Sequence, residues 1–289
     1  MSHTGTSKAR TGSSQNRKHR PNTEFAVGLA RAFGGAILFA LPVFMTMEMW
    51  WLGFYMDRAR LLLLALLNVP LLTALSYHSG FEDTFSLKDD LIDAFVAYAV
   101  GLLASAAILL LCSVIEFGMS WHEVVGKIVL LGIPGSMGAA LAVNQLGGKS
   151  QGDEQPGRED TYLGELFLMV AGALFLSFNV APTEEMILIA YQMTPWHAIA
   201  LVFASLGLMH AFVYAVEFSG QATIEPGTPQ WSVFLRFTVV GYALVFLVSV
   251  YMLWTFGRTD GVGFAEITNT ATVLAFPGAI GAAAARLII

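Results

Sequence analysis

Residues 133–142 read IPGSMGAALA, and residues 276–285 read FPGAIGAAAA, so one Pro-Gly pair with a following run of small residues occurs twice. Both segments lie in long apolar runs, and the two prolines are 143 positions apart (277 − 134). Small residues spaced four apart let two helix backbones approach closely in a membrane. We therefore predict two central helices that pack along their Gly and Ala faces and do not face lipid.

The composition of the chain indicates a membrane protein. Of its 289 residues, 56% are hydrophobic and only 12% are charged, and the mean hydropathy is +0.65. These values are too apolar for a soluble domain of ordinary composition. A lipid bilayer is the predicted environment, and the sequence indicates neither nucleic-acid binding nor a cofactor.

Apolar runs between charged or Pro/Gly-rich breaks predict eight membrane-spanning helices. Their approximate ranges are 32–56, 61–77, 91–117, 124–143, 163–191, 196–216, 231–256 and 264–289. Residues 1–24 are expected to form a disordered basic tail. A polar linker at 147–161 separates a first membrane repeat, 25–146, from a second, 162–289. The predicted fold is an all-α polytopic membrane protein made of two parallel four-helix repeats.

A second motif supports an internal duplication. Residues 44–51 read FMTMEMWW and residues 181–190 read APTEEMILIA, sharing the order Thr-x-Glu-Met at an offset of 137 (185 − 48). Shorter matches that contain Gly link the third and seventh predicted helices at offsets of 140 and 139. Coincidence among small residues is the alternative. Because four helices return the chain to its starting side, the repeats are expected to be parallel.

Basic residues set the predicted orientation of the chain. Eleven Lys and Arg residues fall on the side of the N-terminus and four on the other side. The tail and the start of the first helix supply six of the eleven. Since cytoplasmic loops carry the excess of Lys and Arg, both termini and the linker are predicted to be cytoplasmic.

The two shared glutamates are the main candidates for a functional site. Glu48 and Glu185 each lie nine residues, about 13 Å, before the outer end of a predicted helix. Half of the hydrocarbon core is about 15 Å thick, which predicts both carboxylates near the bilayer centre. A carboxylate there faces a cavity or the bundle interior, or is protonated in a structural hydrogen bond. Glu184 is a weaker candidate, because Met47 occupies its counterpart position.

Neutral oxygens accompany the two glutamates in sequence. Pro42 and Pro182 each remove a backbone donor and free a carbonyl near a Glu. The hydroxyls of Thr46 and Thr183 are candidate ligands, although Thr commonly bonds a carbonyl of its own helix. Asn179 adds a neutral amide. Carboxylate, hydroxyl and carbonyl oxygens suit a proton or a hard cation, whose identity is left open.

Two further features lie in mid-helix. Pro134-Gly135 and Pro277-Gly278 are expected either to unwind or kink their helices or to serve tight packing alone. His210 lies in the apolar stretch LGLMHAFVY, residues 206–214. It is a candidate proton relay, with a structural, hydrogen-bonded His as the alternative.

The segments FALPVFMTMEMWWLG, residues 39–53, and NVAPTEEMILIAYQMTPWHA, residues 179–198, together resemble an uncharacterised family of bacterial integral membrane proteins. The resemblance extends over most of the chain after the tail. It implies a location in the bacterial inner membrane, but it implies no activity and no functional residue.

The adjacent Glu184 and Glu185 are also similar to the Glu pair of intramembrane glutamic proteases. That family has Arg four residues after the second Glu and Phe four residues before its first His. Here Ile189 and Leu206 occupy those places. An activated-water mechanism would therefore lack most of its parts.

The predicted function is a transporter or channel that moves a small cation or protons by means of Glu48 and Glu185. A non-transporting membrane component, such as an assembly factor or a sensor, is the first alternative, and a glutamic protease-like enzyme is the second. Assembly as a homo-oligomer is left open.

Overall fold

The computed structural model describes residues 21–79, 87–146, 162–215 and 230–288, and all regular structure in these ranges is helical. The predicted linker at 147–161 lies outside the described residues, as does most of the predicted tail. Residues 21–24 belong to the first helix of the described chain.

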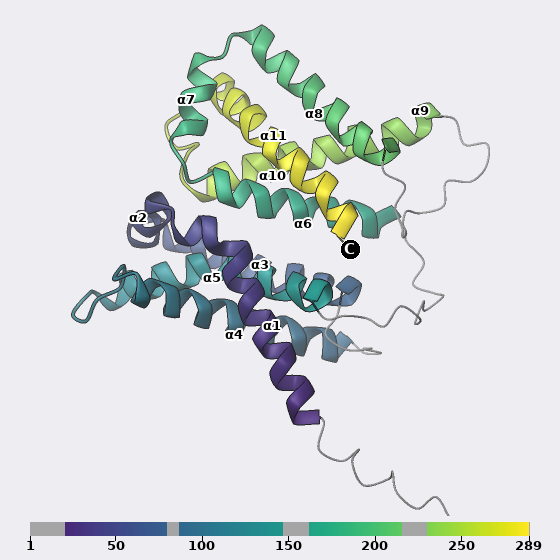
Figure 1. The fold of residues 1–289 in the computed structure, drawn as a ribbon. Helices are drawn as coiled ribbons and strands as arrows, with labels where there is room; N and C mark the ends of the chain where they lie inside the picture. Colours follow the sequence, from purple (N-terminus) through teal and green to yellow (C-terminus); the bar gives the residue numbers. More distant parts are fainter. Residues whose placement is uncertain (1–20, 80–86, 147–161, 216–229, 289) are drawn as a thin grey trace, which may run out of the picture.

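The described chain forms two groups of helices (Figure 1). The first half contains α1 (Pro21–Phe44), α2 (Met47–Tyr55), α3 (Arg58–Ser79), α4 (Leu87–Leu111) and α5 (Trp121–Leu146). The second half contains α6 (Tyr162–Val180), α7 (Glu185–Gln192), α8 (Pro195–Ala215), α9 (Gln230–Val233), the π-helix η1 (Phe234–Val239), α10 (Val240–Thr255) and α11 (Phe264–Ile288). Each half is a long, a short and then three long helical segments, counting α9 to α10 as one.

Eight helical segments are long and apolar enough to cross a membrane, which confirms the all-α fold with eight predicted spans. They are Ala26–Phe44, Arg58–Tyr77, Leu87–Leu111, Trp121–Ala142, Tyr162–Val180, Pro195–Phe212, Phe234–Thr255 and Phe264–Ala285. The recurring order of elements agrees with the predicted duplication. The parallel relation between the two halves stays a prediction, as does the placement of the termini.

The continuous helices predicted at 32–56 and 163–191 are wrong. The first breaks at residues 45–46 and the second at 181–184, so a short helix follows each span. A proline lies at or just before each break, where it removes one backbone donor from the helical ladder. Both short helices lie at the same end of the bundle (Figure 1). We call it the break end; it holds α2, α7 and residues 112–120 and 256–263.

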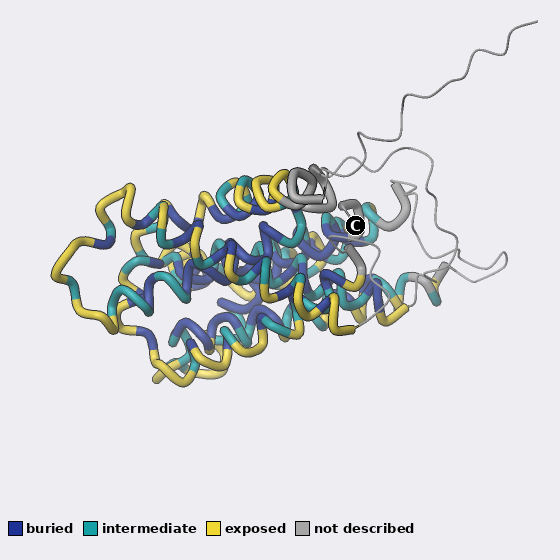
Figure 2. Tube along the Cα trace, turned by 90° about the horizontal axis from the view of Figure 1, so that it is seen from below, coloured by how far each residue is buried: buried dark blue, intermediate teal, exposed yellow. Residues whose placement is uncertain are grey.

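The helices α5 and α11 form the centres of the two halves, as the sequence predicted. The helix α5 contacts α1, α2, α3 and α4, and α11 contacts α6, α7, α8 and α10. In an 18-residue apolar stretch of each of these two spans, 72% and 61% of the residues are buried, against 39% or less in the corresponding stretch of each of the other six. In Figure 2 the buried segments lie in the interior of the bundle and the exposed segments at its outside.

Small residues allow these central helices to touch their neighbours. A Cβ atom added to Gly35 would lie 2.8 Å from the carbonyl oxygen of Gly138 and would also clash with Ala142. In the second half, a Cβ on Gly172 would lie 2.6 Å from the Cβ of Ala285 and would clash with Gly281. Both pairs of helices therefore pack backbone against backbone, the close approach that small residues permit in membranes.

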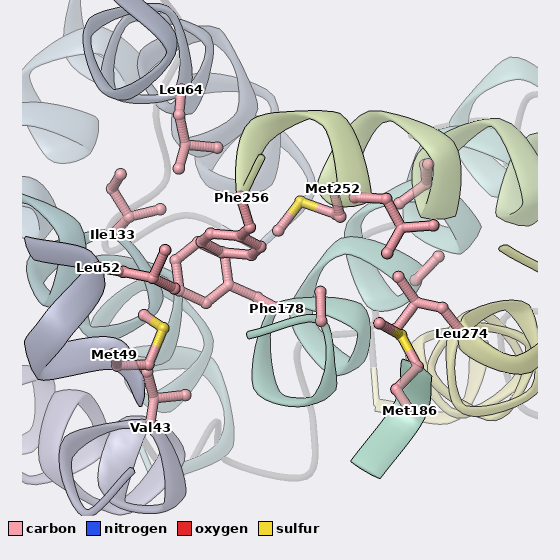
Figure 3. Close-up of a cluster of buried hydrophobic side chains, with 14 of the residues drawn as sticks. Val43, Met49, Leu52, Leu64, Ile133, Phe178, Met186, Met252, Phe256 and Leu274 are labelled. Atoms are coloured by element: carbon pink, nitrogen blue, oxygen red, sulfur yellow. The ribbon is translucent and has the colours of Figure 1, made fainter. Parts of the chain in front are cut away.

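The two halves meet through apolar side chains. The rings of Phe178 and Phe256 pack edge to face with centroids 5.4 Å apart, and in Figure 3 they lie beside Leu52 of the first half. Phe39 of α1 packs against Phe175 of α6 with centroids 5.9 Å apart. One hydrophobic core cluster contains residues of both halves, so burial of apolar surface holds the halves together.

Candidate functional site

The break between α1 and α2 is closed by its own hydrogen bonds. The Thr46 hydroxyl donates to the Pro42 carbonyl at 2.6 Å, and the indole of Trp50 donates to the Phe44 carbonyl at 2.8 Å. Thr46 itself has an extended backbone, with φ −95° and ψ 116°, and it precedes the first residue of α2. The local carbonyl bond, given above as the alternative role of Thr46, is therefore what the structure contains.

Glu48 lies in the first turn of α2 and is half-buried. Its neighbours Met49, Leu52 and Gly53 are buried, and a Cβ on Gly53 would lie 2.7 Å from Lys127 of α5. A carboxylate in the first turn interacts favourably with the positive end of the helix dipole. Glu48 is thus placed at a helix start beside the central helix of its half.

The break between α6 and α7 is closed in a similar way. The Thr183 hydroxyl donates to the Val180 carbonyl at 2.8 Å, and the Asn179 amide donates to the Phe175 carbonyl at 2.7 Å. The buried Asn179 Oδ1 has no hydrogen-bond partner among the described residues. The local bond is again the observed role of the Thr hydroxyl.

Glu184 and Glu185 are exposed, and Glu185 is the first residue of α7. Met186 and Ala190 supply the buried face of this short helix, whereas Glu185 lies on the same side as the exposed Leu188. The expectation that Glu185 faces the bundle interior is therefore wrong.

The predicted depth of both glutamates assumed that each helix runs on past its Glu, but the candidate spans end at Phe44 and Val180. The depth of the two carboxylates in a bilayer therefore stays a prediction. Glu48 and Glu185 lie beyond those ends, in the short helices at the break end. In the structure the Thr-x-Glu-Met motif lies at the start of a new helix. A polar residue followed by an early Glu is a common signal for a helix start.

Pro134-Gly135 and Pro277-Gly278 lie inside continuous helices, so of the alternatives given above the structure contains no unwinding at either pair. Their packing role is present: a Cβ on Gly278 would lie 3.0 Å from the Ser177 hydroxyl and 2.9 Å from Val245.

His210 lies apart from the glutamates. It is 15 residues after the first residue of α8, which corresponds to about 22 Å along the helix from the break end. Its Nδ1 atom is 3.3 Å from the Thr238 hydroxyl, and its ring packs edge to face on Phe234 at 5.1 Å. Both partners belong to the π-helix η1, which the sequence did not predict. The seven predicted ion-site residues are thus not brought together in one place.

Arg258 is a site residue that the sequence analysis missed. Its guanidinium donates to the Pro182 carbonyl, which belongs to the break between α6 and α7. Its buried Nε atom has no partner among the described residues. The position 139 residues earlier, which follows the matched Phe117-Gly118 pair, is Met119. Nothing in the local sequence pattern distinguishes Arg258, because its partner is distant along the chain.

Arg60 and Asp260 form an ion pair between the halves at the break end. Two nitrogens of Arg60 lie 2.8 Å and 2.9 Å from the Asp260 carboxylate. Arg60 also donates to the Trp254 carbonyl at 2.8 Å, and its guanidinium carbon lies 4.9 Å from the centre of the Trp254 ring. Because Arg60 donates hydrogen bonds to it, the Asp260 carboxyl has a pKa below its ordinary value of 3.8.

The break end is acidic. Residues 45–60, 112–127, 181–197 and 256–266 contain eight Asp and Glu but only four Lys and Arg. Lys127 pairs with Glu123 at 2.6 Å, and Arg60 pairs with Asp260. Within the described ranges, no group of three or more His, Cys, Asp and Glu residues is arranged to hold a metal ion. The arrangement therefore offers dispersed negative charge at one end of the bundle.

Comparison with known proteins gives one match. The sequence model of a family described as "Putative integral membrane protein (DUF2391)" matches residues 28–289. No curated protein and no solved structure matches the chain.

Proposed function

The chain belongs to this family of multi-pass integral membrane proteins of unknown function, and we propose that it moves a small cation or protons as a transporter or channel. One observation carries the proposal: at the break in each half, a glutamate lies in the first turn of a short helix that contacts the central helix. A carboxylate attracts cations through its charge, and a matched pair places that charge in both halves.

We assign Glu48 and Glu185 to the mouth of the path. The half-buried Glu48 and the exposed Glu185 would attract a cation to the break end, from which it would enter the bundle. Glu184 would add negative charge there. Thr46 and Thr183 would hold the breaks in shape, since their hydroxyls bond backbone carbonyls. The excess of acidic residues at this end supports the assignment, because clustered charge raises the local concentration of counter-ions.

The proposal includes an orientation. With both termini in the cytoplasm, the break end would face the outside of a bacterial inner membrane. The tail and linker that carry most of the basic residues behind this orientation lie outside the described residues. Reactivity of the native Cys112, which is exposed at the break end, toward a membrane-impermeant thiol reagent in whole cells would test it. Labelling from outside supports the orientation, and labelling only after lysis contradicts it.

Ion flux in proteoliposomes tests the function. Vesicles with a trapped pH dye receive gradients of Na⁺, K⁺, Ca²⁺ or Mn²⁺, for the wild type and for the Glu48→Gln/Glu185→Gln double variant. We expect cation-dependent flux that falls about tenfold in the double variant, as loss of electrostatic attraction at a mouth predicts. The matched control is Glu116→Gln, which removes an exposed carboxylate from the loop between α4 and α5 at the same end.

Two outcomes would contradict the proposal. Absence of flux for every cation, from folded wild-type protein, contradicts transport of these ions. Equal loss of flux in Glu116→Gln would assign the effect to the general acidity of the break end and not to the two matched glutamates.

A non-transporting membrane component is the second candidate, and one observation favours it. At the two breaks, the carbonyls of Pro42, Phe44, Val180 and Pro182 already accept side-chain hydrogen bonds, and the interface between the halves is apolar. In that case the Glu variants would fold normally and the wild type would carry no flux.

A further inference from the structure

The contacts within each half differ in kind from the contacts between the halves. Within a half, a Cβ added to Gly101 of α4 or to Gly172 of α6 would clash with the backbone of a neighbouring helix. Each described glycine that meets another backbone in this way meets one of its own half. Between the halves, α3 contacts α6 and α10, and α5 contacts α6, without such a glycine contact. Each half is therefore packed as a rigid unit, and the interface between them separates more easily.

One polar cluster joins the two units at the break end. Arg60, the third residue of α3, donates to the Asp260 carboxylate at 2.8 Å and 2.9 Å and to the Trp254 carbonyl at 2.8 Å. Its guanidinium also lies over the Trp254 ring. Gly257, with a φ of 73°, turns the chain between Trp254 and Asp260. We call Arg60, Trp254 and Asp260 the clasp, because they connect the first half to the second.

The clasp can break without a large penalty. The side chains of Arg60 and Asp260 are 19% and 57% exposed. An ion pair in contact with water stabilises a structure only slightly, because water solvates both charges when the pair separates. The clasp can therefore open and close while each half stays folded.

An apolar layer lies beside the clasp. Phe256, two residues after Trp254, packs edge to face on Phe178 with centroids 5.4 Å apart, and Leu52 of α2 lies beside both rings (Figure 3). We call Leu52, Phe178 and Phe256 the apolar layer; each is at most 4% exposed. Apolar constrictions exclude water and ions. Glu48 lies one helical turn, about 6 Å, before Leu52, so the proposed cation mouth adjoins this layer.

The clasp is connected to both short helices. Arg258 lies within the segment 254–260 and donates to the carbonyl of Pro182, in the break before α7. Arg58, two residues before the arginine of the clasp, donates to the Phe54 carbonyl of α2 at 3.1 Å. A movement of the clasp would therefore reach the helices that carry the proposed cation ligands.

The clasp has no counterpart on the other side of the duplication. The offsets of 137 and 139 place His197 and Trp121 at the positions of Arg60 and Asp260. A His and a Trp cannot form the same ion pair, because the indole has no acidic group. His197 Nδ1 instead lies 2.7 Å from the hydroxyl of Thr194 in its own half. The clasp thus arose on one shared scaffold only once.

We propose that the two halves rock against each other as rigid bodies and that the clasp is the gate at the break end. The inference rests on the proposed function, because it describes how access of a cation to Glu48 and Glu185 is controlled. With the clasp closed, the apolar layer blocks the path. When the clasp opens, the halves part at this end and water and a cation enter. Rigid-body rocking of one repeat against another around a site gives alternating access in transporters.

Distances between spin labels test the movement without any need for ion flux. In a Cys112→Ser background, Tyr55→Cys of α2 and Tyr191→Cys of α7 place one label on each half at the break end, on exposed side chains. Tyr55→Cys with Trp121→Cys places both labels on the first half as the control. Each pair is measured in proteoliposomes by double electron–electron resonance, with the native clasp and with Asp260→Asn.

We expect Asp260→Asn to raise the share of longer distances between the halves about threefold, since loss of an exposed ion pair shifts a two-state equilibrium modestly. The charge swap Arg60→Asp/Asp260→Arg should restore the shorter distances, and the control pair should not change. Equal distances with the native clasp and with Asp260→Asn, from folded protein, would overturn the gate. An equal shift in the control pair would also overturn it, because the first half would then not be rigid.

Cross-linking across the clasp tests its effect on transport. Arg60→Cys and Asp260→Cys, again with Cys112→Ser, are joined by a reducible bifunctional thiosulfonate, and Arg60→Cys alone is the control. Flux should stop in the cross-linked protein and return after reduction. Flux that continues through cross-linked protein would overturn the gate and leave the proposed function standing. If the wild type carries no flux, the proposed function fails, and the spin-label distances decide whether the halves move.

Discussion

In the first half, Gly35 of α1 packs against Gly138 of α5, and in the second half Gly172 of α6 packs against Gly281 of α11. The loops that precede the central helices also agree, because the matched Gly118 and Gly257 both have positive φ angles, 101° and 73°. Glycine adopts such angles without the steric penalty of other residues. The backbone scaffold is thus alike in the two halves.

The polar groups of the two halves differ. The first half has the buried residues Asn68, Ser105 and Ser136, where offsets of 137, 140 and 143 place Ser205, Val245 and Ala279 in the second half. The second half instead has Arg258 at its break, where the first half has Met119. Packing against a glycine face tolerates no change of volume, whereas a buried polar group needs only a local partner. The comparison teaches that shared packing and distinct chemistry coexist in this fold.

The largest expected effect is on the shared packing. Gly35→Ala and Gly172→Ala should each lower the free energy of unfolding by about 3 kcal/mol, because the added methyl overlaps a neighbouring helix. Thermal unfolding in detergent, followed by Trp fluorescence, measures the loss. Gly34→Ala and Gly207→Ala are matched controls, since an added Cβ there meets nothing within 4 Å. A large loss of unfolding free energy for only one of the two variants would contradict the conclusion that the two halves pack alike.

The next effect concerns the break of the second half alone. Arg258→Met removes the hydrogen bond to Pro182 and should lower the free energy of unfolding by about 2 kcal/mol, the typical value for a bond to a charged group. The reverse change at the counterpart, Met119→Arg, should give no matching gain. Urea unfolding of the detergent-solubilised protein compares the two. A neutral result for Arg258→Met would show that the second break does not depend on its guanidinium.

A smaller effect concerns the ion pair between the halves. Because the pKa of Asp260 is lowered in the folded state, its pairing with Arg60 contributes stability above the ordinary carboxyl pKa of 3.8. That contribution is lost as the pH falls through the lowered folded-state value. The unfolding temperature of the wild type should therefore fall more steeply below pH 4 than that of Asp260→Asn. If the unfolding temperatures of the wild type and of Asp260→Asn fall in parallel with pH, the ion pair does not stabilise the contact between the halves.

The smallest effect is expected for the stability of the Glu variants. Glu185→Gln should change the free energy of unfolding by no more than about 0.5 kcal/mol, since an exposed side chain loses few contacts. Glu48→Gln should cost more, because Glu48 is half-buried. Thermal unfolding of both variants measures the difference. A large loss for Glu185→Gln would assign that residue a structural role and weaken the transport proposal.

Several features of the fold were predictable because they depend on local patterns. The eight apolar runs of spanning length correspond to eight helical segments long enough to cross a membrane. The repeated PGxxGAA segments lie in the two central helices. Span length and small-residue spacing act through the bilayer thickness and through direct backbone contact, so neighbours in sequence are sufficient to reveal them.

The candidate site was harder to predict. The motif that Thr46 and Glu48 share with Thr183 and Glu185 is visible in the sequence, but the helix break beside each copy was not predicted. An apolar helix continues through a proline or stops near it, and the flanking residues do not decide which. Whether the helix breaks depends on whether the short helix after the proline packs against another helix. The helix α2 packs against α5, where Gly53 contacts Lys127. That partner is more than 70 positions away (127 − 53).

The sequence by itself determined that this chain is a helical membrane protein, that its two central helices are rich in small residues, and that its halves share motifs. These properties follow from hydrophobicity and side-chain volume summed over neighbouring residues. Only the tertiary structure decided where each glutamate lies and that Arg258 reaches Pro182. It also decided that Asn68 Oδ1 and Ser105 Oγ are buried without a hydrogen-bond partner among the described residues. Such facts depend on contacts between distant segments, whose hydrogen bonds are made or left unmade only when the helices pack.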